Sequence, residues 1–193
     1  MADMNFVKVK QPTAMEICKA VELGEEARQL LQTAALPSEF LQQLLEKELY
    51  LDAVRFLATA LPKREATWWA CQCARNNCGE TPSVTDLKAI ELAEAWVYKP
   101  TAENRLPTMA AATKTDFKTA AGWAAIAAFW SGGNISPVQN ATVEPAEDLF
   151  PKAVSGAVIL AAVQDDADKI KSNYQLLLKK GIDIACGGTG KLV

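Results

Sequence analysis

Hydrophobic residues recur at spacings of three and four along most of the chain, the pattern of helices with one buried face. The clearest stretch begins at Phe40, continues through Leu44 to Leu61 and stops before Pro62, which predicts one bent helix or two consecutive helices. Similar patterns predict further helices over residues 13–23, 25–33, 62–76, 83–97, 101–115, 117–130, 147–163 and 166–180. Because no series of strands is visible, the sequence predicts an all-α fold: a single domain of about eight to nine helices over residues 13–186, packed as antiparallel hairpins or as an irregular bundle.

Residues with known preferences for helix ends support several of these boundaries. Thr13 is followed three residues later by Glu16, a capping-box pattern that opens a helix. Ser38 is predicted to cap the next long helix, and Thr101 begins another just after a proline. Gly181 is predicted to end the last helix, since glycine is favoured immediately after a helix.

Three segments lack a helical pattern. Residues 1–12 are predicted to be an extended or frayed N-terminal arm, and residues 187–193 a flexible, glycine-rich tail. Residues 131–146 form the longest internal segment without helical periodicity, and loops of that length tend to be functional or disordered. The preceding segment, 117–130, is apolar on every side and is therefore expected to be the most buried helix.

Composition excludes several classes of function. The chain has 193 residues, of which half are hydrophobic, and a formal net charge of -3 without a concentrated basic segment, which argues against nucleic-acid binding. Its apolar runs are too short to span a bilayer, so no membrane insertion is expected. The N-terminus lacks the apolar core of a signal peptide, so we expect a cytoplasmic protein whose five cysteines stay reduced.

The sequence contains no histidine, the usual general base near neutral pH and the commonest metal ligand. Cys71, Cys73 and Cys78 do not have the spacing of a zinc knuckle and are predicted to be small buried hydrophobic residues. The glycine-rich segment that ends in Lys191 lacks the leading glycine and the following Ser or Thr of a phosphate loop. We therefore expect no catalytic residues, no metal and no cofactor, and a protein that is not an enzyme.

Two polar clusters, together with a nearby tryptophan, are candidates for a binding surface. One opens the helix after Pro100, and the other is the glycine turn that follows the apolar helix. Aromatic and arginine side chains commonly anchor interfaces. The structural alternative places the tryptophans in the core and pairs Arg105 with a carboxylate. The candidate surface comprises Trp96, Glu103, Asn104, Arg105, Trp130, Ser131, Gly132, Gly133 and Asn134.

Several segments resemble a family of uncharacterised bacterial helical proteins known as a domain of unknown function. They are WWACQCAR at 68–75, AWV at 95–97, PTAENR at 100–105, AGWAAIAAFWSGG at 121–133, AVSGAV at 153–158 and GIDIA at 181–185. The resemblance spans about residues 35–186. It implies an association with type VI secretion loci, and it supplies no catalytic residues.

These observations favour a non-catalytic protein-interaction protein, an accessory or adaptor of a bacterial secretion system with a protein partner. A small-ligand-binding protein, or a histidine-free enzyme, with a pocket between helices is the alternative. That pocket would be built from Trp96, Arg105, Trp130 and Asn134. A structural homo-oligomer is the third interpretation. Convergence of Arg105 and the 131–134 turn on a deep polar pocket would favour the ligand hypothesis.

Overall fold

A computed structural model describes residues 4–76, 78–79, 83–136, 138, 141–164 and 167–191. Within these residues the chain is entirely helical apart from loops and turns, and no strand is present. The helices are α1 (Ala14–Cys18), α2 (Glu25–Leu31), α3 (Pro37–Glu46), α4 (Tyr50–Ala60), α5 (Lys63–Asn76), α6 (Val84–Tyr98), α7 (Ala102–Lys114), α8 (Ala120–Phe129), α9 (Leu149–Val163) and α10 (Ile170–Ala185), with a short 3-10 helix at Ala167–Lys169. The predicted all-α class is confirmed.

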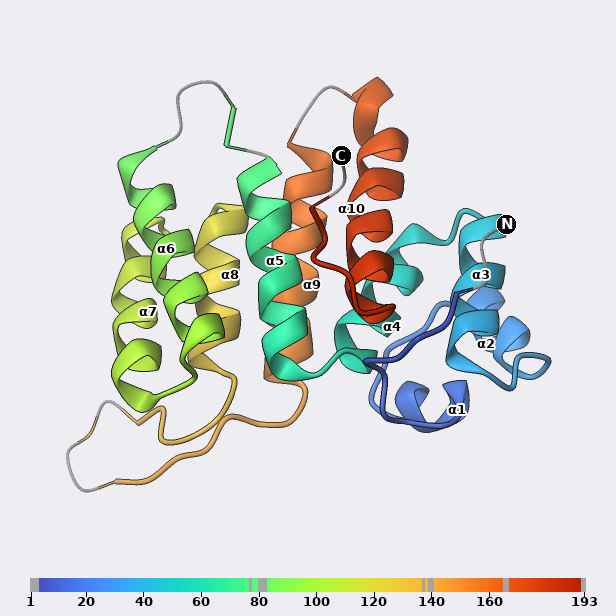
Figure 1. Cartoon of the computed structure of the whole chain (residues 1–193), viewed down its shortest axis with the longest axis horizontal. Coiled ribbons are helices and arrows are strands. Elements are labelled where there is room, and N and C mark those ends of the chain that lie inside the picture. The colour runs from blue at the N-terminus through green and yellow to red at the C-terminus, as the bar shows by residue number, and fades with distance from the viewer. Residues whose placement is uncertain are drawn as a thin grey trace.

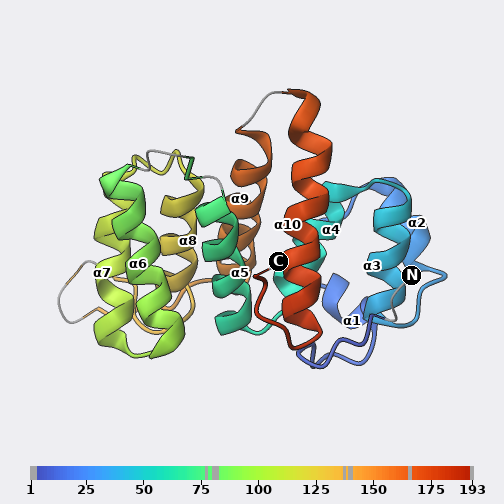
Figure 2. The ribbon, with the colours of Figure 1, turned by 45° about the horizontal axis from the view of Figure 1, so that its top comes forward.

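The helices from α5 to α10 run alternately up and down, so each is antiparallel to the next along the chain (Figure 1). The helices α6, α7 and α8 form one end of the molecule, α5, α9 and α10 the middle, and α1 to α3 the other end (Figure 2). Helix α8 packs against α5, α6, α7 and α9, and α9 in turn packs against α4, α5 and α10. The arrangement matches the predicted antiparallel hairpins.

The long hydrophobic stretch predicted after residue 38 is two helices rather than one. Helix α3 ends at Glu46, and α4 begins at Tyr50 after a turn in which Glu48 has a left-handed φ of 57°. The predicted cap at Ser38 is wrong. The cap residue is Leu36, whose N–H donates to a Glu39 carboxylate oxygen at 3.0 Å, and the fixed φ of the next residue, a proline, suits the first turn.

Threonine side chains begin three of the helices. The hydroxyl of Thr13 accepts a hydrogen bond from the N–H of Glu16, which confirms the predicted cap. Thr101 accepts from the N–H of Asn104 in the same way at the start of α7. The hydroxyl of Thr119 caps α8 by accepting a hydrogen bond from the N–H of Gly122 at 3.1 Å. Each cap satisfies one of the N–H groups that the first turn of a helix leaves without a partner.

Helix α8 is the most buried of the described helices, as its composition predicts. All of its residues are buried except Trp123, which is half-buried. The Trp123 ring packs against α9 at Gly156, where an added Cβ would lie 3.0 Å from the indole Cε3. Small residues on both helices therefore bring the two backbones close together and leave room for one large ring.

Gly181 lies inside α10 and does not end it, so the predicted end is wrong by one turn. A Cβ at this position would lie 2.6 Å from Cε2 of Trp69 and 2.7 Å from Cδ2 of Leu57. Gly181 is therefore required by close packing between α10, α5 and α4 rather than by the geometry of a helix end. The helix continues to Ala185.

The segments at the two ends of the sequence lie against the same part of the molecule. Lys8 N–H donates to the carbonyl of Ala185 at 3.0 Å, which fixes the extended arm beside the end of α10. After α10, the N–H groups of Gly188 and Gly190 donate to the backbone and side chain of Asp183, both at 2.8 Å. These hydrogen bonds, together with one from Nε1 of Trp68 to the carbonyl of Thr189, place residues 187–191 of the predicted tail against α10 and α5.

None of the helices in the described residues is long and apolar enough to cross a membrane.

Replacing Gly122 by alanine tests the packing of α8 on the end of α7. The added Cβ would lie 2.0 Å from Oγ1 of Thr115, a buried residue, so we expect a loss of about 1–3 kcal/mol of stability despite alanine's better helix propensity. Urea denaturation followed by circular dichroism measures the change. In a Thr115→Ala background the same replacement is expected to cost much less. Equal costs in both backgrounds would show that Thr115 is not the obstacle.

Candidate functional site

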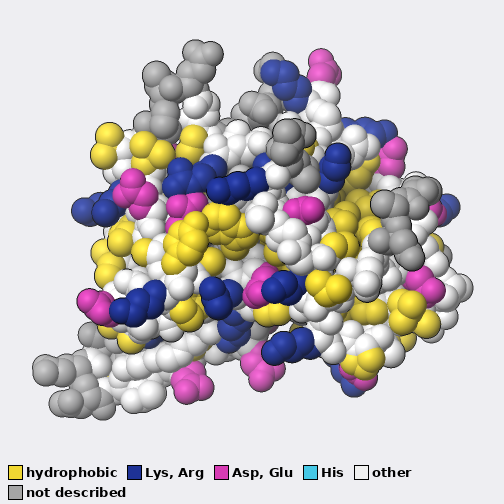
Figure 3. Space-filling view, viewed as in Figure 1, with side chains coloured by type: hydrophobic (Ala, Val, Ile, Leu, Met, Phe, Trp, Pro, Cys, Tyr) yellow, Lys and Arg dark blue, Asp and Glu magenta, His cyan; other side chains and the backbone are white. Residues whose placement is uncertain are grey.

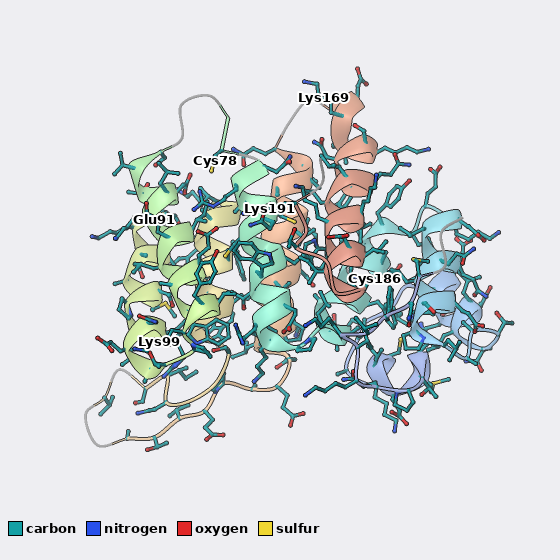
Figure 4. All side chains as sticks on the ribbon, in the orientation of Figure 1. Cys78, Glu91, Lys99, Lys169, Cys186 and Lys191 are labelled. Atoms are coloured by element: carbon teal, nitrogen blue, oxygen red, sulfur yellow. The ribbon has the colours of Figure 1, made fainter. Side chains whose placement is uncertain are left out.

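The loop that leaves α8 folds beneath the ends of α6, α7 and α8, at the lower left of Figure 1. It encloses, with the start of α7, an open pocket of about 790 Å³, which we call the Arg105 pocket. Lys99, labelled in Figure 4, marks the turn between α6 and α7 at this end of the molecule. The pocket is lined by Trp96, Pro100, Thr101, Ala102, Arg105, Leu106, Ser131, Gly132, Gly133, Asn134, Ser136 and Val138.

Arg105 is the only charged residue among those that line this pocket in the described chain, and only 7% of its surface is exposed. Its Nη1 donates to the carbonyl of Phe129 at 2.9 Å, and its Nη2 donates to the carbonyl of Asn134 at 3.0 Å. The guanidinium also lies over the Phe129 ring, 5.3 Å from the centroid. Arg105 thus links α7 to the end of α8 and to the loop beyond it.

The charge of Arg105 is not matched by a carboxylate in the described chain, contrary to the structural alternative. Burial lowers the pKa of its guanidinium below the ordinary value, because removal from water disfavours the charged form. The end of α8 partly offsets this cost, since helix C-termini carry partial negative charge. A guanidinium has five N–H donors, so two carbonyl bonds leave it able to bind an anion.

The glycine turn is shaped to fit this arginine. Gly133 has a φ of 67°, which favours glycine, and a Cβ there would lie 3.0 Å from Nη2 of Arg105. The side chain of Asn134 organises the rest of the loop. Its Oδ1 accepts from the N–H groups of Ser136 and Val143, and its Nδ2 donates to the carbonyl of Ala141.

Of the nine candidate residues, the pocket brings together Trp96, Arg105, Ser131, Gly132, Gly133 and Asn134. Asn104 is instead structural, because its side-chain amide donates to the carbonyls of Ala95 and Lys99 at 3.2 and 2.8 Å. Glu103 is exposed outside the pocket, and Trp130 is half-buried against the core.

Two exposed apolar side chains, Leu106 and Val138, complete the pocket and were not expected from the sequence. Leu106 is exposed because it lies one position after Arg105 and thus on another face of α7. The only signal in the sequence is that Leu106 is an apolar residue outside the three-and-four spacing of the buried face of α7. Val138 has no such signal, since it lies in a loop.

Trp69 and Arg75, in the WWACQCAR segment, lie away from this pocket. Trp69 is completely buried, and its Nε1 donates to the carbonyl of Leu177 at 2.8 Å. Arg75 forms a two-pronged ion pair with Glu94, at 2.6 and 2.7 Å, which joins α5 to α6. This pairing raises the pKa of Arg75 above its ordinary value. The charge of Arg75 is thus matched by a carboxylate within the chain, and Trp69 has no exposed surface to offer a ligand.

A second pocket, of about 310 Å³, lies between the segment after α1 and helices α4 and α9. Its charged side chains are already paired within the chain. Nζ of Lys152 lies 2.7 Å from a carboxylate oxygen of Asp148 and 3.9 Å from one of Glu22, and Nη1 of Arg55 lies 3.9 Å from Oδ1 of Asp52. This pairing makes it a weaker candidate than the Arg105 pocket.

The cysteines do not gather into a metal site in the described residues. Cys71 and Cys73 have no exposed surface and pack in the core, as predicted. Cys78 lies beyond the end of α5 and is half-buried, with its thiol donating to the carbonyl of Ala74 at 3.3 Å. Burial raises the pKa of each of the three thiols, so their metal-binding thiolate forms are disfavoured.

Thiol titration tests this burial. In the native protein a disulfide reagent is expected to label Cys71 and Cys73 far more slowly than an exposed thiol, since the thiolate is the nucleophile and both groups lack solvent contact. Burial also raises the pKa of Cys18 to about 12, which slows its reaction. All five cysteines should react after denaturation. Fast labelling of all five in the native state would contradict the structure.

No curated protein and no solved structure matches the chain. A family model does match, over residues 40–185, which is most of the sequence and includes every residue of the Arg105 pocket. The chain therefore belongs to the family of unknown function DUF6931.

Proposed function

We propose that the chain is a non-catalytic interaction protein, an accessory or adaptor, that binds a protein partner at the Arg105 pocket. The observation that carries this proposal is a buried guanidinium that has no carboxylate partner in the described chain and that lines an open pocket. Charged groups in sheltered surroundings make strong hydrogen bonds to carboxylates. The group that would complete this pocket is therefore a carboxylate from another molecule, bound to the Arg105 guanidinium.

The rest of the lining supports a protein segment as the carrier of that carboxylate. Leu106 and Val138 are 52% and 63% exposed beside the arginine, and Trp96 forms part of the wall. Burial of such apolar groups provides affinity, while the buried charge provides specificity. An extended segment with an acidic residue or a free carboxylate next to an apolar side chain fits this arrangement.

The lining also supports a role without catalysis. Its polar side chains in the described residues are hydroxyls, an amide and a guanidinium, together with an indole. None of these is a general base near neutral pH. The resemblance to proteins encoded at type VI secretion loci makes components of that system the first partners to test in a cytoplasmic setting.

The experiment uses Leu106→Glu, which places a negative charge beside Arg105 on an exposed position and should leave the fold intact. The wild-type chain is used to capture partners from a native bacterial cell, with quantitative mass spectrometry. We expect a protein that is enriched by the wild type and lost with Leu106→Glu. Arg28→Met, on the exposed surface of α2 at the far end of the molecule, is the matched control and should retain it.

Several outcomes would overturn this proposal. Equal recovery of every captured protein by the wild type and Leu106→Glu would show that the pocket is not the binding surface. A small carboxylic acid retained in native mass spectrometry, with no protein enriched, would favour the ligand-binding alternative, which the same guanidinium also supports. Capture of a second copy of this chain alone would favour a structural homo-oligomer.

A further inference from the structure

A separate pocket of about 480 Å³ lies on the face of the molecule shown in Figure 3, over α5 and the lower ends of α6 and α10. We call it the Trp68 pocket. The extended N-terminal arm and the segment after α10 both contribute to it, and their backbones are fixed there by hydrogen bonds. It is lined by Lys8, Arg64, Glu65, Trp68, Val97, Tyr98, Ile184, Gly187, Gly188, Thr189 and Lys191.

The Trp68 pocket is positively charged although the chain as a whole is acidic. Three cationic side chains and one carboxylate line it, a local charge of +2 in a chain of formal charge -3. Nζ of Lys8 forms an ion pair with Oε1 of Glu65 at 3.6 Å. Arg64 uses its Nε to reach the carbonyl of Val97 at 2.9 Å, and neither Arg64 nor Lys191 forms an ion pair in the described chain. The pocket therefore has two cations to offer to an anion.

Two aromatic rings line the pocket together with these cations. Trp68 packs edge-on against Tyr98, with centroids 5.9 Å apart, and its Nε1 donates to the carbonyl of Thr189 at 2.7 Å. The ammonium of Lys191, labelled in Figure 4 in front of α5, lies 5.9 Å from the Trp68 centroid. Tyr98 is 70% exposed, and its hydroxyl has no partner in the described residues. An exposed ring of this kind offers a stacking surface.

The geometry points to a binding site for a phosphate ester that carries a planar ring. A phosphate monoester has about two negative charges at neutral pH, which match the two cations without carboxylate partners, Arg64 and Lys191. The planar ring would stack on Tyr98 beside Trp68. This inference does not depend on the Arg105 pocket, which lies elsewhere and differs in chemistry.

The glycine-rich segment beside the pocket does not act as a phosphate loop. The N–H groups of Gly187, Gly188 and Gly190 all donate within the chain, to the carbonyls of Ile184 and Asp183 and to the Asp183 side chain. The segment instead places the ammonium of Lys191 over the Trp68 ring. Side-chain cations, rather than backbone amides, therefore supply the positive charge.

Isothermal titration calorimetry with adenosine 5′-monophosphate tests the inference on the full chain. We expect saturable binding that weakens as sodium chloride is raised, since exposed charges are screened by salt. Lys191→Gln should weaken binding about tenfold, which corresponds to the loss of one charged contact. Tyr98→Leu should weaken binding of the nucleotide but not of inorganic phosphate. Lys169→Gln, an exposed lysine distant from the pocket in Figure 4, is the matched control and should bind as the wild type does.

Arg64→Gln is a second charge variant, although its Nε bond to the α6 end means that its folding must be checked by circular dichroism. Lys191 is exposed at the edge of the fold, so its replacement keeps the test valid. No binding of the nucleotide at millimolar concentration, or binding unchanged in Lys191→Gln, would overturn the inference. If inorganic phosphate binds as tightly as the nucleotide, stacking on Tyr98 does not contribute to binding. If adenosine binds as tightly as the nucleotide, the phosphate group does not contribute. Leu106→Glu should bind the nucleotide normally, which separates this result from the Arg105 pocket.

Discussion

Replacing Trp69 by alanine is expected to lower the free energy of unfolding by about 3–5 kcal/mol, the usual cost of removing a large aromatic side chain from a core. Trp69 has no exposed surface and lies where α5, α4 and α10 meet. The change removes the packing of the indole against Leu57 and Gly181, and the hydrogen bond from Nε1 to the carbonyl of Leu177. Chemical denaturation followed by circular dichroism measures the difference.

A second substitution shows whether this contact is the cause. Gly181→Ala alone should destabilise the protein, because its Cβ would lie 2.6 Å from the Trp69 ring. In the Trp69→Ala background the same change should cost much less, because the vacated space takes the methyl group and lets the Leu57 side chain, whose Cδ2 would lie 2.7 Å from it, move away. Additive effects of the two changes would contradict direct contact between them.

Replacing Arg105 by methionine is expected to reduce stability by about 1–3 kcal/mol and to loosen the loop after α8. The carbonyls of Phe129 and Asn134 lose their charged donor, and the turn at Gly133 loses the group against which it packs. Denaturation measures the global effect. Hydrogen exchange measures the local one, as faster exchange of the N–H groups in residues 131–136.

Lysine at the same position separates charge from geometry. Lys keeps the positive charge, but its single ammonium does not have the planar fork that reaches two carbonyls in different directions. We therefore expect Arg105→Lys to lie between the wild type and Arg105→Met in both measurements. If lysine restores full stability, the charge alone supports the loop, and the fork geometry has no role.

Much of the fold follows from local patterns in the sequence. The spacing of apolar residues predicts the helices, and the caps at Thr13 and Thr101 follow from hydroxyl chemistry at the first turn. Pro107 does not break α7, which runs to Lys114 as expected. Gly181 shows where local rules end: glycine can mark a helix end or a close contact, and only the position of Trp69 from another helix decides between them.

The candidate site was partly predictable for the same reason. Arg105 and the glycine turn are unusual residues at helix ends, and the structure brings them together. Asn104 has the same local appearance but fastens α7 to the end of α6, because the carbonyls it reaches come from a neighbouring helix. The exposed position of Val138 depends on how the loop folds back over Asn134, which no periodicity encodes.

The alanine-rich character of α8 has a consequence for how the pocket at its end would meet another molecule. Alanine has no side-chain rotamers to immobilise. The packed face of an alanine-rich helix such as Ala120–Phe129 therefore has few side-chain conformations that could change on binding. Arg105 donates a hydrogen bond to the carbonyl of Phe129, the last residue of that helix. The wall is thus already in its final shape before contact, and association at this end should proceed without a slow rearrangement of the helices.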